Sequence, residues 1–248
     1  MKILLTTCTR RSFDDAWNTR LYKSTNTYND FNCASMNYMK DDQTLLRGKS
    51  FDLLVNHSHT KSLTQTYNKC INYAHENQYD TIVLVHDDLS IEDNMLISKV
   101  SDALKEYSIV GLAGSAAAAI KLPALWHLMG EQTDWRGAVC HRGEDNGKEA
   151  FGWTNYGPSP NRVLILDGLF LACKVQDLIK NNVKFDENIP HGGYHHYDIL
   201  FSLAANRAGL KLGVWPIWAV HDSPGLLSQT PQYRESEQYF LKAANALL

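Results

Sequence analysis

The chain has 248 residues, 44% of them hydrophobic, with 24 Lys and Arg against 27 Asp and Glu. This length and composition can supply one large core, so we expect a single domain. The formal charge of -3 leaves no surplus of cations for a nucleic-acid backbone or an anionic lipid surface, which disfavours both as partners.

The first half of the chain alternates short apolar runs with segments of helical periodicity. The apolar runs predict buried strands at residues 2–7, 51–55, 81–85 and 109–112. Apolar residues at helical spacing predict helices over residues 63–74 and 92–107. Because strands that alternate with helices favour parallel pairing, we expect an α/β, Rossmann-like domain with a mostly parallel central sheet flanked by helices.

The second half becomes regular after a long interval. Residues 123–160 are rich in Trp, Gly, His and charged residues, and this composition indicates long loops rather than a linker between domains. Beyond them, apolar runs predict strands at residues 163–166, 169–173 and 212–220. Helices are predicted over residues 194–208, where Gly209 ends the helix, and over residues 235–246.

The sequence predicts neither a membrane anchor nor a disulfide framework. Its apolar runs are far shorter than the roughly 20 residues that span a bilayer, and the apolar start is shorter than a signal-peptide core. The five cysteines are scattered and never spaced as C-x-x-C, which also argues against a structural zinc site. We therefore expect a cytoplasmic protein.

The segment His86-Asp87-Asp88 follows the predicted strand at residues 81–85 directly. Open α/β sheets bind ligands beyond the carboxyl ends of their strands, and paired acids can hold a divalent cation that neutralises a diphosphate. The alternative is a solvated turn in which Asp88 caps the next helix.

A second histidine and acid pair, His221-Asp222, also follows an apolar strand. It could meet Asp88 from a distant part of the chain, and an imidazole together with a carboxylate can coordinate a metal ion. A lone histidine at a strand end is more often an ordinary polar residue, so the metal-site hypothesis depends on its pairing with the segment His86-Asp87-Asp88.

Residues 191–198 combine two glycines, three histidines and Asp198 at a predicted helix start. Glycines allow close backbone approach, and an acid in the first helical turn tends towards its ionised form, which suits proton abstraction. Helix capping by Asp198 is the alternative. A zinc site is not favoured, because no Cys or His ladder surrounds these histidines.

Polar residues near the first two predicted strands and the first predicted helix could contact a nucleotide. No Walker or G-x-G-x-x-G pattern is present, which argues against a P-loop or a dinucleotide-binding site. The predicted donor-binding residues are Thr7, Thr9, Arg10, Asn56, Tyr67, Asn68 and Asp87.

Five segments in chain order carry a resemblance to a known family. They are S-L-T-Q-T-Y-N at 62–68, V-L-V-H-D-D at 83–88, L-D-G-L-F-L-A at 166–172, H-H-Y-D at 195–198, and A-N-R-A-G-L-K-L-G-V with V-H-D within 205–222. The set resembles the family-2-type glycosyltransferases. It is most similar to a small bacterial and phage branch, which implies the cytoplasm of a bacterium or of a phage-infected host cell.

The resemblance implies a GT-A fold in one domain, residues 1–248. Residues 1–120 would form the nucleotide-sugar half and residues 121–248 the acceptor and catalytic half. Asp88 matches the metal-binding acid of the family's D-x-D-like motif, while His86 replaces the first acid of that motif. Asp88 and His221 are therefore the main expected ligands of Mn²⁺ or Mg²⁺, with His86 as a third candidate.

The same resemblance implies a reaction. Asp198 matches the family's catalytic base, and the acceptor side would include Asp167, Gly168, His196 and Tyr197. The sequence thus predicts transfer of a sugar from a nucleotide-diphosphate sugar to an acceptor hydroxyl, with inversion at the anomeric carbon. A glycan, a protein side chain, a lipid-linked sugar and a hydroxymethylated DNA base all stay open as acceptors.

Two other functions compete with sugar transfer. A sugar-phosphate nucleotidyltransferase also needs a metal and a nucleotide site, but it would want a glycine-rich first loop, and residues 6–11 hold arginines and no glycine. A non-catalytic nucleotide- or sugar-binding module is the second alternative. Trp126, Trp135, Trp153 and Tyr156 could stack on sugars or bases, although packing of the long loops is their simpler role.

Overall fold

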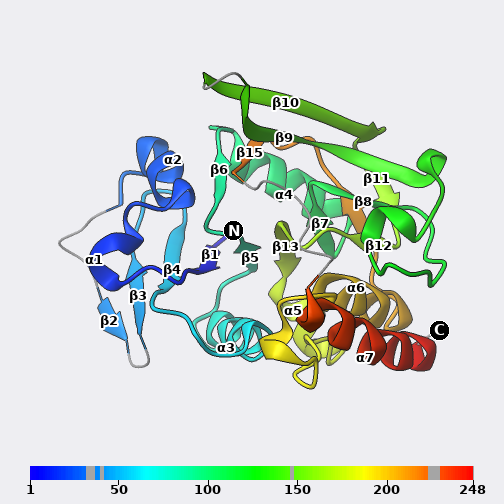
Figure 1. The fold of residues 1–248 in the computed structure, drawn as a ribbon. Helices are drawn as coiled ribbons and strands as arrows, with labels where there is room; N and C mark the ends of the chain where they lie inside the picture. The colour runs from blue at the N-terminus through cyan, green and yellow to red at the C-terminus, as the bar shows by residue number, and fades with distance from the viewer. Residues whose placement is uncertain (32–36, 40–41, 146–147, 223–229, 248) are drawn as a thin grey trace.

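The computed structural model describes residues 1–31, 37–39, 42–145, 148–222 and 230–247. Within these ranges the chain forms a nine-stranded sheet and a smaller sheet, with helices packed around them (Figure 1). In the same ranges, no helix has the length and apolar character that crossing a bilayer requires.

The nine-stranded sheet holds the centre of the molecule. In spatial order its strands are β11 (Asn161–Val163), β14 (Leu212–Val214), β7 (Ile109–Gly111), β13 (Phe170–Lys174), β5 (Thr81–Val85), β1 (Ile3–Cys8), β4 (Asp52–Asn56), β3 (Gln43–Leu46) and β2 (Asn37–Met39). The β5 strand is buried along its whole length, as are β4 and β7. These are the apolar runs that the sequence pattern identified as strands.

The prediction of a mostly parallel sheet is corrected to a mixed sheet. The β1 strand pairs in parallel with β4 and β5, and β14 pairs in parallel with β7. The β13 strand, however, lies antiparallel between β5 and β7, and β3 lies antiparallel to β4. A strand buried on both faces has the same continuous apolar pattern in either direction, so its sequence does not report its polarity.

The four helices predicted from apolar periodicity are present as α3 (Leu63–Glu76), α4 (Leu96–Glu106), α6 (Tyr197–Arg207) and α7 (Pro231–Leu247). Three further helices, α1 (Phe13–Ala16), α2 (Arg20–Asn29) and α5 (Val175–Lys180), were not predicted. The α3 helix begins at Ser62, whose hydroxyl accepts a hydrogen bond from the Gln65 N–H at 3.3 Å. The α6 helix begins later than predicted, because His196 takes a left-handed conformation at its start.

The smaller sheet comes mostly from segments for which the sequence pattern predicts no strand. Its strands are β12 (Ile165–Leu166), β8 (Ala113–Ser115), β9 (Trp135–Asp145), β15 (Ala219–His221) and β6 (Leu89–Ile91), with β10 (Lys148–Gly157) paired to β9. The prediction of long loops over residues 123–160 was therefore wrong for β9 and β10, which form the long hairpin at the top of Figure 1. No residue of β10 is fully buried, and its sequence lacks the alternation of apolar and polar residues that marks a half-buried strand.

The two halves of the chain share one core. The β13 strand comes from the second half and sits between β5 and β7 of the first half. Buried residues of both halves belong to one continuous hydrophobic cluster. The predicted single strand over residues 212–220 is divided between the sheets as β14 and β15, on either side of Pro216.

Candidate active site

Strand pairing in the smaller sheet brings His221 beside the segment that follows β5. His86 and Asp88 lie in the turn between β5 and β6, and β6 pairs antiparallel with β15 so that His221 is opposite Leu89. The backbone N–H of Asp222 donates to the Asp88 carbonyl at 3.0 Å, which fixes the two segments together. Residues more than 130 positions apart in the sequence thus meet at one sheet edge.

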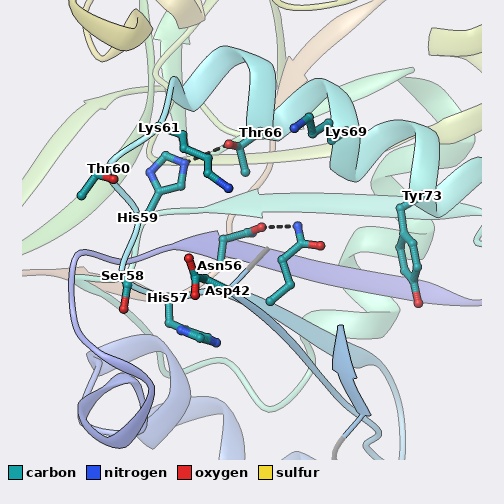
Figure 2. A pocket seen from close by; sticks show the side chains of 11 residues that line it. Asp42, Asn56, His57, Ser58, His59, Thr60, Lys61, Thr66, Lys69 and Tyr73 are labelled. Carbon is teal, nitrogen blue, oxygen red and sulfur yellow. Dashed lines mark hydrogen bonds between the residues drawn. The ribbon is translucent and has the colours of Figure 1, made fainter. Parts of the chain in front are cut away.

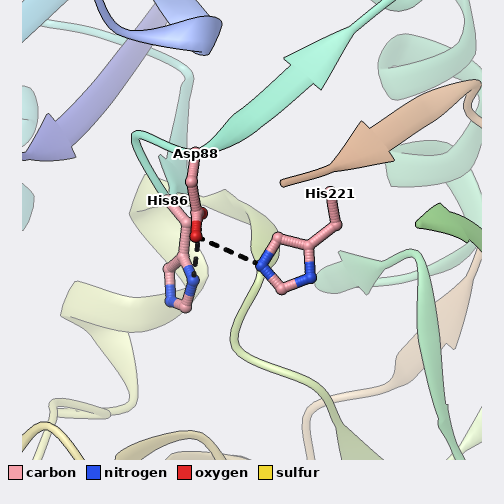
Figure 3. Close-up of side chains that lie close together, drawn as sticks. All are labelled: His86, Asp88 and His221. Atoms are coloured by element: carbon pink, nitrogen blue, oxygen red, sulfur yellow. Dashed lines mark ion pairs between the residues drawn. The ribbon is translucent and has the colours of Figure 1, made fainter. Parts of the chain in front are cut away.

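Three side chains converge at this edge (Figure 3). The Asp88 carboxylate lies 3.5 Å from His221 Nε2 and 3.9 Å from His86 Nδ1. One ligand atom from each of the three residues lies within 4.8 Å of the others. Asp88 Oδ1 is buried and has no hydrogen-bond partner among the described residues, so this oxygen can bind a cation.

The donor set fits a divalent cation. Atoms that share one ion at about 2.1 Å lie roughly 3–4 Å apart, which the Asp88 contacts already approach. Burial lowers the pKa of His86, and a neutral imidazole is the form that binds metal. Burial alone would raise the pKa of Asp88, but its hydrogen bond with His221 and its electrostatic interaction with His86 lower that pKa and favour the carboxylate.

Tyr197 fixes the orientation of the His86 ring. The Tyr197 hydroxyl donates to the Gly168 carbonyl at 3.1 Å, so its oxygen accepts the proton of His86 Nε2 across 2.8 Å. The other ring nitrogen, Nδ1, then keeps its lone pair and faces Asp88. Support of this kind from outside the ligand set is common for metal-binding histidines.

Asp222 has a structural role and does not join the cluster. Its carboxylate forms ion pairs with Arg20 Nε at 2.5 Å and with Arg142 Nε at 2.6 Å. These contacts tie the end of β15 to α2 and β9. Of the pair His221-Asp222, the histidine therefore reaches the site and the acid holds the strand in place.

Asp198 lies in the first turn of α6, and its carboxylate faces the loop after β12. Oδ2 accepts a hydrogen bond from the Gly168 N–H at 3.0 Å, and Oδ1 accepts one from the Ile199 N–H at 2.9 Å. Burial, with the nearby Asp167 charge, raises the pKa of Asp198 to about 7 despite these bonds. The expectation of an easily ionised helix-start acid is corrected, because desolvation outweighs the helix terminus.

Asp198 shares a cavity with two of the three clustered side chains. This cavity, which we call the α6 cavity, is lined by His86, His221, Asp167, Asp198, Trp126 and Tyr156 among other residues, and it measures about 440 Å³. Gly168, His196 and Tyr197 also line it, so all the predicted acceptor-side residues meet there. At Gly168, a Cβ atom would stand 2.3 Å from the Tyr197 hydroxyl, so this position has room for glycine alone.

A second cavity opens on the other side of His86. This β1 cavity, of about 390 Å³, is lined by the loop after β1 together with His59, Tyr67, Asp87, Asp88 and Tyr194. Thr9 and Arg10 are among its loop residues, and the Arg10 guanidinium lies 5.5 Å from the centre of the Tyr194 ring. Four predicted donor-binding residues, Thr9, Arg10, Tyr67 and Asp87, are therefore gathered in one place.

Three other predicted donor-binding residues lie outside the β1 cavity. The Asn68 amide bonds the Phe185 backbone in both directions, with both contacts at 2.9 Å, and thereby fixes the segment after α5. Thr7 is buried within the sheet. The Asn56 amide bonds the Thr7 carbonyl at 2.9 Å, and its side chain lines a neighbouring pocket beside His59 (Figure 2). These three residues make packing or backbone contacts in the structure, and their contact with a donor stays a prediction.

Several lining residues were not predicted. His59 bonds Thr66 at 2.9 Å and the Tyr194 hydroxyl at 3.0 Å, and it lines both the β1 cavity and the neighbouring pocket. His127, His141 and Tyr233 line the α6 cavity. His127 and His141 lie in the segment predicted as long loops, and Tyr233 precedes the predicted helix over residues 235–246. Local sequence held no signal that they would meet.

The chain matches the model of one protein family. A family model described as "Glycosyltransferase like family" matches residues 47–243, which include Asp88, Asp198 and His221. The chain belongs to this glycosyltransferase-like family. Membership identifies the chain as a transferase enzyme and confirms the resemblance seen in the sequence. Comparison with curated protein sequences gives no match.

Solved structures show the same kind of fold. S. aureus TarS 1-349 in complex with UDP gives a TM-score of 0.52 at 11% identity, over 100% of this chain and 65% of that chain. A structure of S. aureus TarS gives 0.50 at 12% identity, over 90% and 37%. A197 from STIV gives 0.45 at 10% identity, over 87% and 82%. The two TarS structures confirm the GT-A-like fold, and this chain spans less than two thirds of each.

Proposed function

We propose that the chain transfers a sugar from a nucleotide-diphosphate sugar to an acceptor hydroxyl, with inversion at the anomeric carbon. The observation that carries the proposal is the shared cavity, in which Asp198 faces the same space as His86 and His221. Membership in the glycosyltransferase-like family favours this reaction over nucleotidyl transfer and over a non-catalytic module. The division into donor and acceptor halves follows the two cavities on either side of His86.

The donor would occupy the β1 cavity with its diphosphate towards Asp88. Arg10 offers a cation at the mouth, and the loop after β1 offers backbone and hydroxyl groups. S. aureus TarS 1-349, which shares the fold, was crystallised in complex with UDP, and this supports a nucleoside diphosphate as the ligand to test first. Tyr67 and Asp87 would complete the donor contacts.

His86, Asp88 and His221 would hold Mn²⁺ or Mg²⁺. Two imidazoles with one carboxylate suit Mn²⁺ better than Mg²⁺, which prefers oxygen ligands. The ion, when bound, supplies positive charge that stabilises a departing diphosphate. Tyr197 contributes by holding the His86 ring with Nδ1 towards the site.

Asp198 would act as the base. Its carboxylate takes the proton of the acceptor hydroxyl while the acceptor oxygen forms a bond to the anomeric carbon. The bond between that carbon and the diphosphate oxygen breaks, and its electron pair leaves with the nucleoside diphosphate. Attack from the face opposite the leaving group inverts the configuration. A pKa of about 7 matches the base to neutral pH, because a stronger base that is still ionised abstracts protons better.

A donor panel tests the proposal. We expect one nucleotide sugar, in the presence of Mn²⁺, to raise the melting temperature, because a ligand of the folded state stabilises it. The same compound should release nucleoside diphosphate, and a chelator should abolish both effects. A melting temperature unchanged by every UDP-, GDP-, ADP- and dTDP-sugar, with and without Mn²⁺, would contradict the proposal.

Two further measurements separate the alternatives. A nucleotidyltransferase would consume a nucleoside triphosphate and a sugar phosphate and release pyrophosphate, so a pyrophosphate assay addresses it directly. A binding module would show the donor-dependent rise in melting temperature without release of nucleoside diphosphate. Substitution of Asp102, an exposed acid on α4 that pairs with Lys105, gives the control Asp102→Asn for changes at Asp88 and Asp198.

A further inference from the structure

The charges that line the α6 cavity have one sign. Asp167 and Asp198 line it, and none of its lining residues within the described part of the chain is a lysine or an arginine. The β1 cavity differs, because both Arg10 and Arg11 line that space. An anionic ligand in the α6 cavity would therefore meet two carboxyl groups without a matching cation from the protein.

Burial keeps three of the histidines that line the α6 cavity neutral at neutral pH. Burial lowers the pKa of His127 and of His195, and it lowers the pKa of His196 to about 3. These rings are therefore neutral and act as polar hydrogen-bonding groups. They offer no ionic partner to a phosphate.

His196 presents an unused hydrogen-bond acceptor. Ser236 Oγ donates its proton to the His195 carbonyl at 3.4 Å, so its oxygen accepts the proton of His196 Nδ1 across 3.0 Å. In the neutral ring, Nε2 then carries a lone pair and no proton. This Nε2 atom is buried without a partner, and the whole His196 residue is 5% exposed. A buried acceptor of this kind is stabilised by a ligand that brings a hydroxyl proton.

Aromatic rings supply the apolar part of the cavity. Trp126 and Tyr156 pack edge to face with ring centres 5.0 Å apart, and Tyr233 lines the cavity near His196. Aromatic faces cover the C–H face of a sugar ring, while carboxylates and bare imidazole nitrogens accept from its hydroxyls. The cavity thus combines flat apolar surface with hydrogen-bond acceptors, which favours a ligand rich in donors.

We propose that the acceptor is an uncharged polyhydroxy compound, a neutral sugar or the neutral end of a glycan, bound in the α6 cavity. One hydroxyl donates to His196 Nε2 and the reacting hydroxyl donates to Asp198. This inference rests on the proposed function. Acceptors that carry phosphate close to the reacting hydroxyl, such as a hydroxymethylated base within a DNA strand, are disfavoured by the two acids.

Matched probe pairs test the charge argument without turnover. The pairs are glucose and glucose 6-phosphate, N-acetylglucosamine and its 6-phosphate, and 5-hydroxymethyl-2′-deoxycytidine and its 5′-monophosphate. Binding to the full chain is measured by saturation-transfer NMR and by tryptophan fluorescence. We expect at least one neutral sugar to bind, and its phosphorylated partner to bind at least about tenfold more weakly, because like charges oppose at short range. Equal or tighter binding of the phosphorylated partner, or no binding by any neutral probe, would overturn the inference.

Substitution at Leu125, a half-buried residue of the cavity wall, tests the same point within the protein. Leu125→Lys adds a cation, and Leu125→Gln adds a polar side chain of similar length without charge. We expect the preference for the neutral partner to fall at least about threefold in Leu125→Lys and to persist in Leu125→Gln. An unchanged preference in Leu125→Lys would remove the electrostatic basis of the inference.

A substitution at His196 tests the proposed hydrogen bond between a sugar hydroxyl and Nε2. Asn accepts a left-handed backbone conformation and can keep a bond to Ser236, so His196→Asn removes mainly the Nε2 acceptor. We expect neutral-sugar binding to weaken about three- to tenfold, while the donor-dependent rise in melting temperature is retained. Wild-type sugar binding in this variant would contradict the assigned contact. Selective sugar binding without any sugar transfer would count against the proposed function and leave the acceptor class intact.

Discussion

The β1 cavity and the α6 cavity share the wall at His86 but differ in charge and in surface. The β1 cavity combines Arg10 and Arg11 with acids at its far end, whereas the α6 cavity combines two acids, neutral histidines and aromatic rings. The first arrangement suits a ligand with a charged diphosphate. The second suits a ligand with hydroxyl groups and little charge.

Under the proposed function, this difference would keep the two substrates apart. Cations on one side and carboxyl groups on the other would give each substrate a preferred cavity before any specific contact forms. The residues at the boundary, His86 and Tyr197, connect the metal candidates to the loop that carries Gly168. Changes on either side should therefore affect one substrate more than the other, and changes at the boundary should affect both.

The largest expected effect comes from Asp198→Asn on the α6 side. Removal of the base should lower kcat about 10²- to 10⁴-fold, the usual contribution of a general base. Donor binding should stay near the wild-type value, because Asp198 does not line the β1 cavity. Steady-state kinetics and the donor-dependent melting temperature report the two effects separately. Retained turnover in Asp198→Asn would refute the base assignment, and Asp102→Asn is the control.

Asp88→Asn should produce the next largest effect, at the boundary. Loss of the carboxylate from the cluster of His86, Asp88 and His221 should weaken Mn²⁺ binding at least about 100-fold, because hard cations need the charged oxygen. Direct titration of Mn²⁺ by electron paramagnetic resonance measures the change. Equal affinity in Asp88→Asn and in Asp102→Asn would show that the cluster does not hold the metal.

Below the midpoint of its pH profile, kcat/KM should fall about tenfold for each pH unit. Because the base must be ionised, kcat/KM should rise with pH to a plateau, with a midpoint near the Asp198 pKa of about 7.

The raised pKa of Asp198 also lowers the stability of the folded protein at high pH, because the native state resists ionisation of this carboxyl group. The loss of stability grows from pH about 4, the ordinary Asp value, and is complete above about 7. Asp198→Asn should therefore melt higher than wild type at pH 8 and about equally at pH 4. A lower melting temperature at pH 8 would contradict the raised pKa.

Gly168→Ala should disturb both cavities through Tyr197. The added Cβ would stand 2.3 Å from the Tyr197 hydroxyl, so this ring must move away from His86. We expect a loss of about 1–3 kcal/mol in the free energy of unfolding and a weaker Mn²⁺ affinity. Tyr197→Phe keeps the ring and removes the hydroxyl, so it should weaken Mn²⁺ binding with a smaller loss of stability. Wild-type metal affinity in both variants would separate Tyr197 from the metal cluster.

Arg10→Gln should give the smallest effect, confined to the β1 side. Arg10 lies at the exposed mouth of the β1 cavity over Tyr194, where solvent screens its charge. We expect the donor KM to rise about three- to tenfold with little change in kcat or in the acceptor KM. Arg207→Gln, on the exposed end of α6, is a matched control. A larger effect on the acceptor KM than on the donor KM would break the proposed division of charge.

Local sequence determined the parts of the site that depend on neighbouring residues. The apolar run at residues 81–85 predicted β5, and its abrupt polar end placed His86 and Asp88 at a sheet edge, as observed. A helix was predicted from residue 194, and although α6 begins at Tyr197, Asp198 lies in its first turn as expected. Such local predictions hold in the folded chain because the end of a strand and the start of a helix depend on a few consecutive residues.

Tertiary structure alone decided which of these parts meet and how each is charged. The antiparallel pairing of β15 with β6 places His221 beside Asp88, and no local pattern specifies a partner strand so far away in the chain. The direction of β13 and the β9–β10 hairpin were decided in the same way, by burial and pairing across the fold. Asp198 shows the same limit for chemistry: the sequence placed it at a helix start that favours ionisation, and packing beside Asp167 in the α6 cavity raised its pKa to about 7.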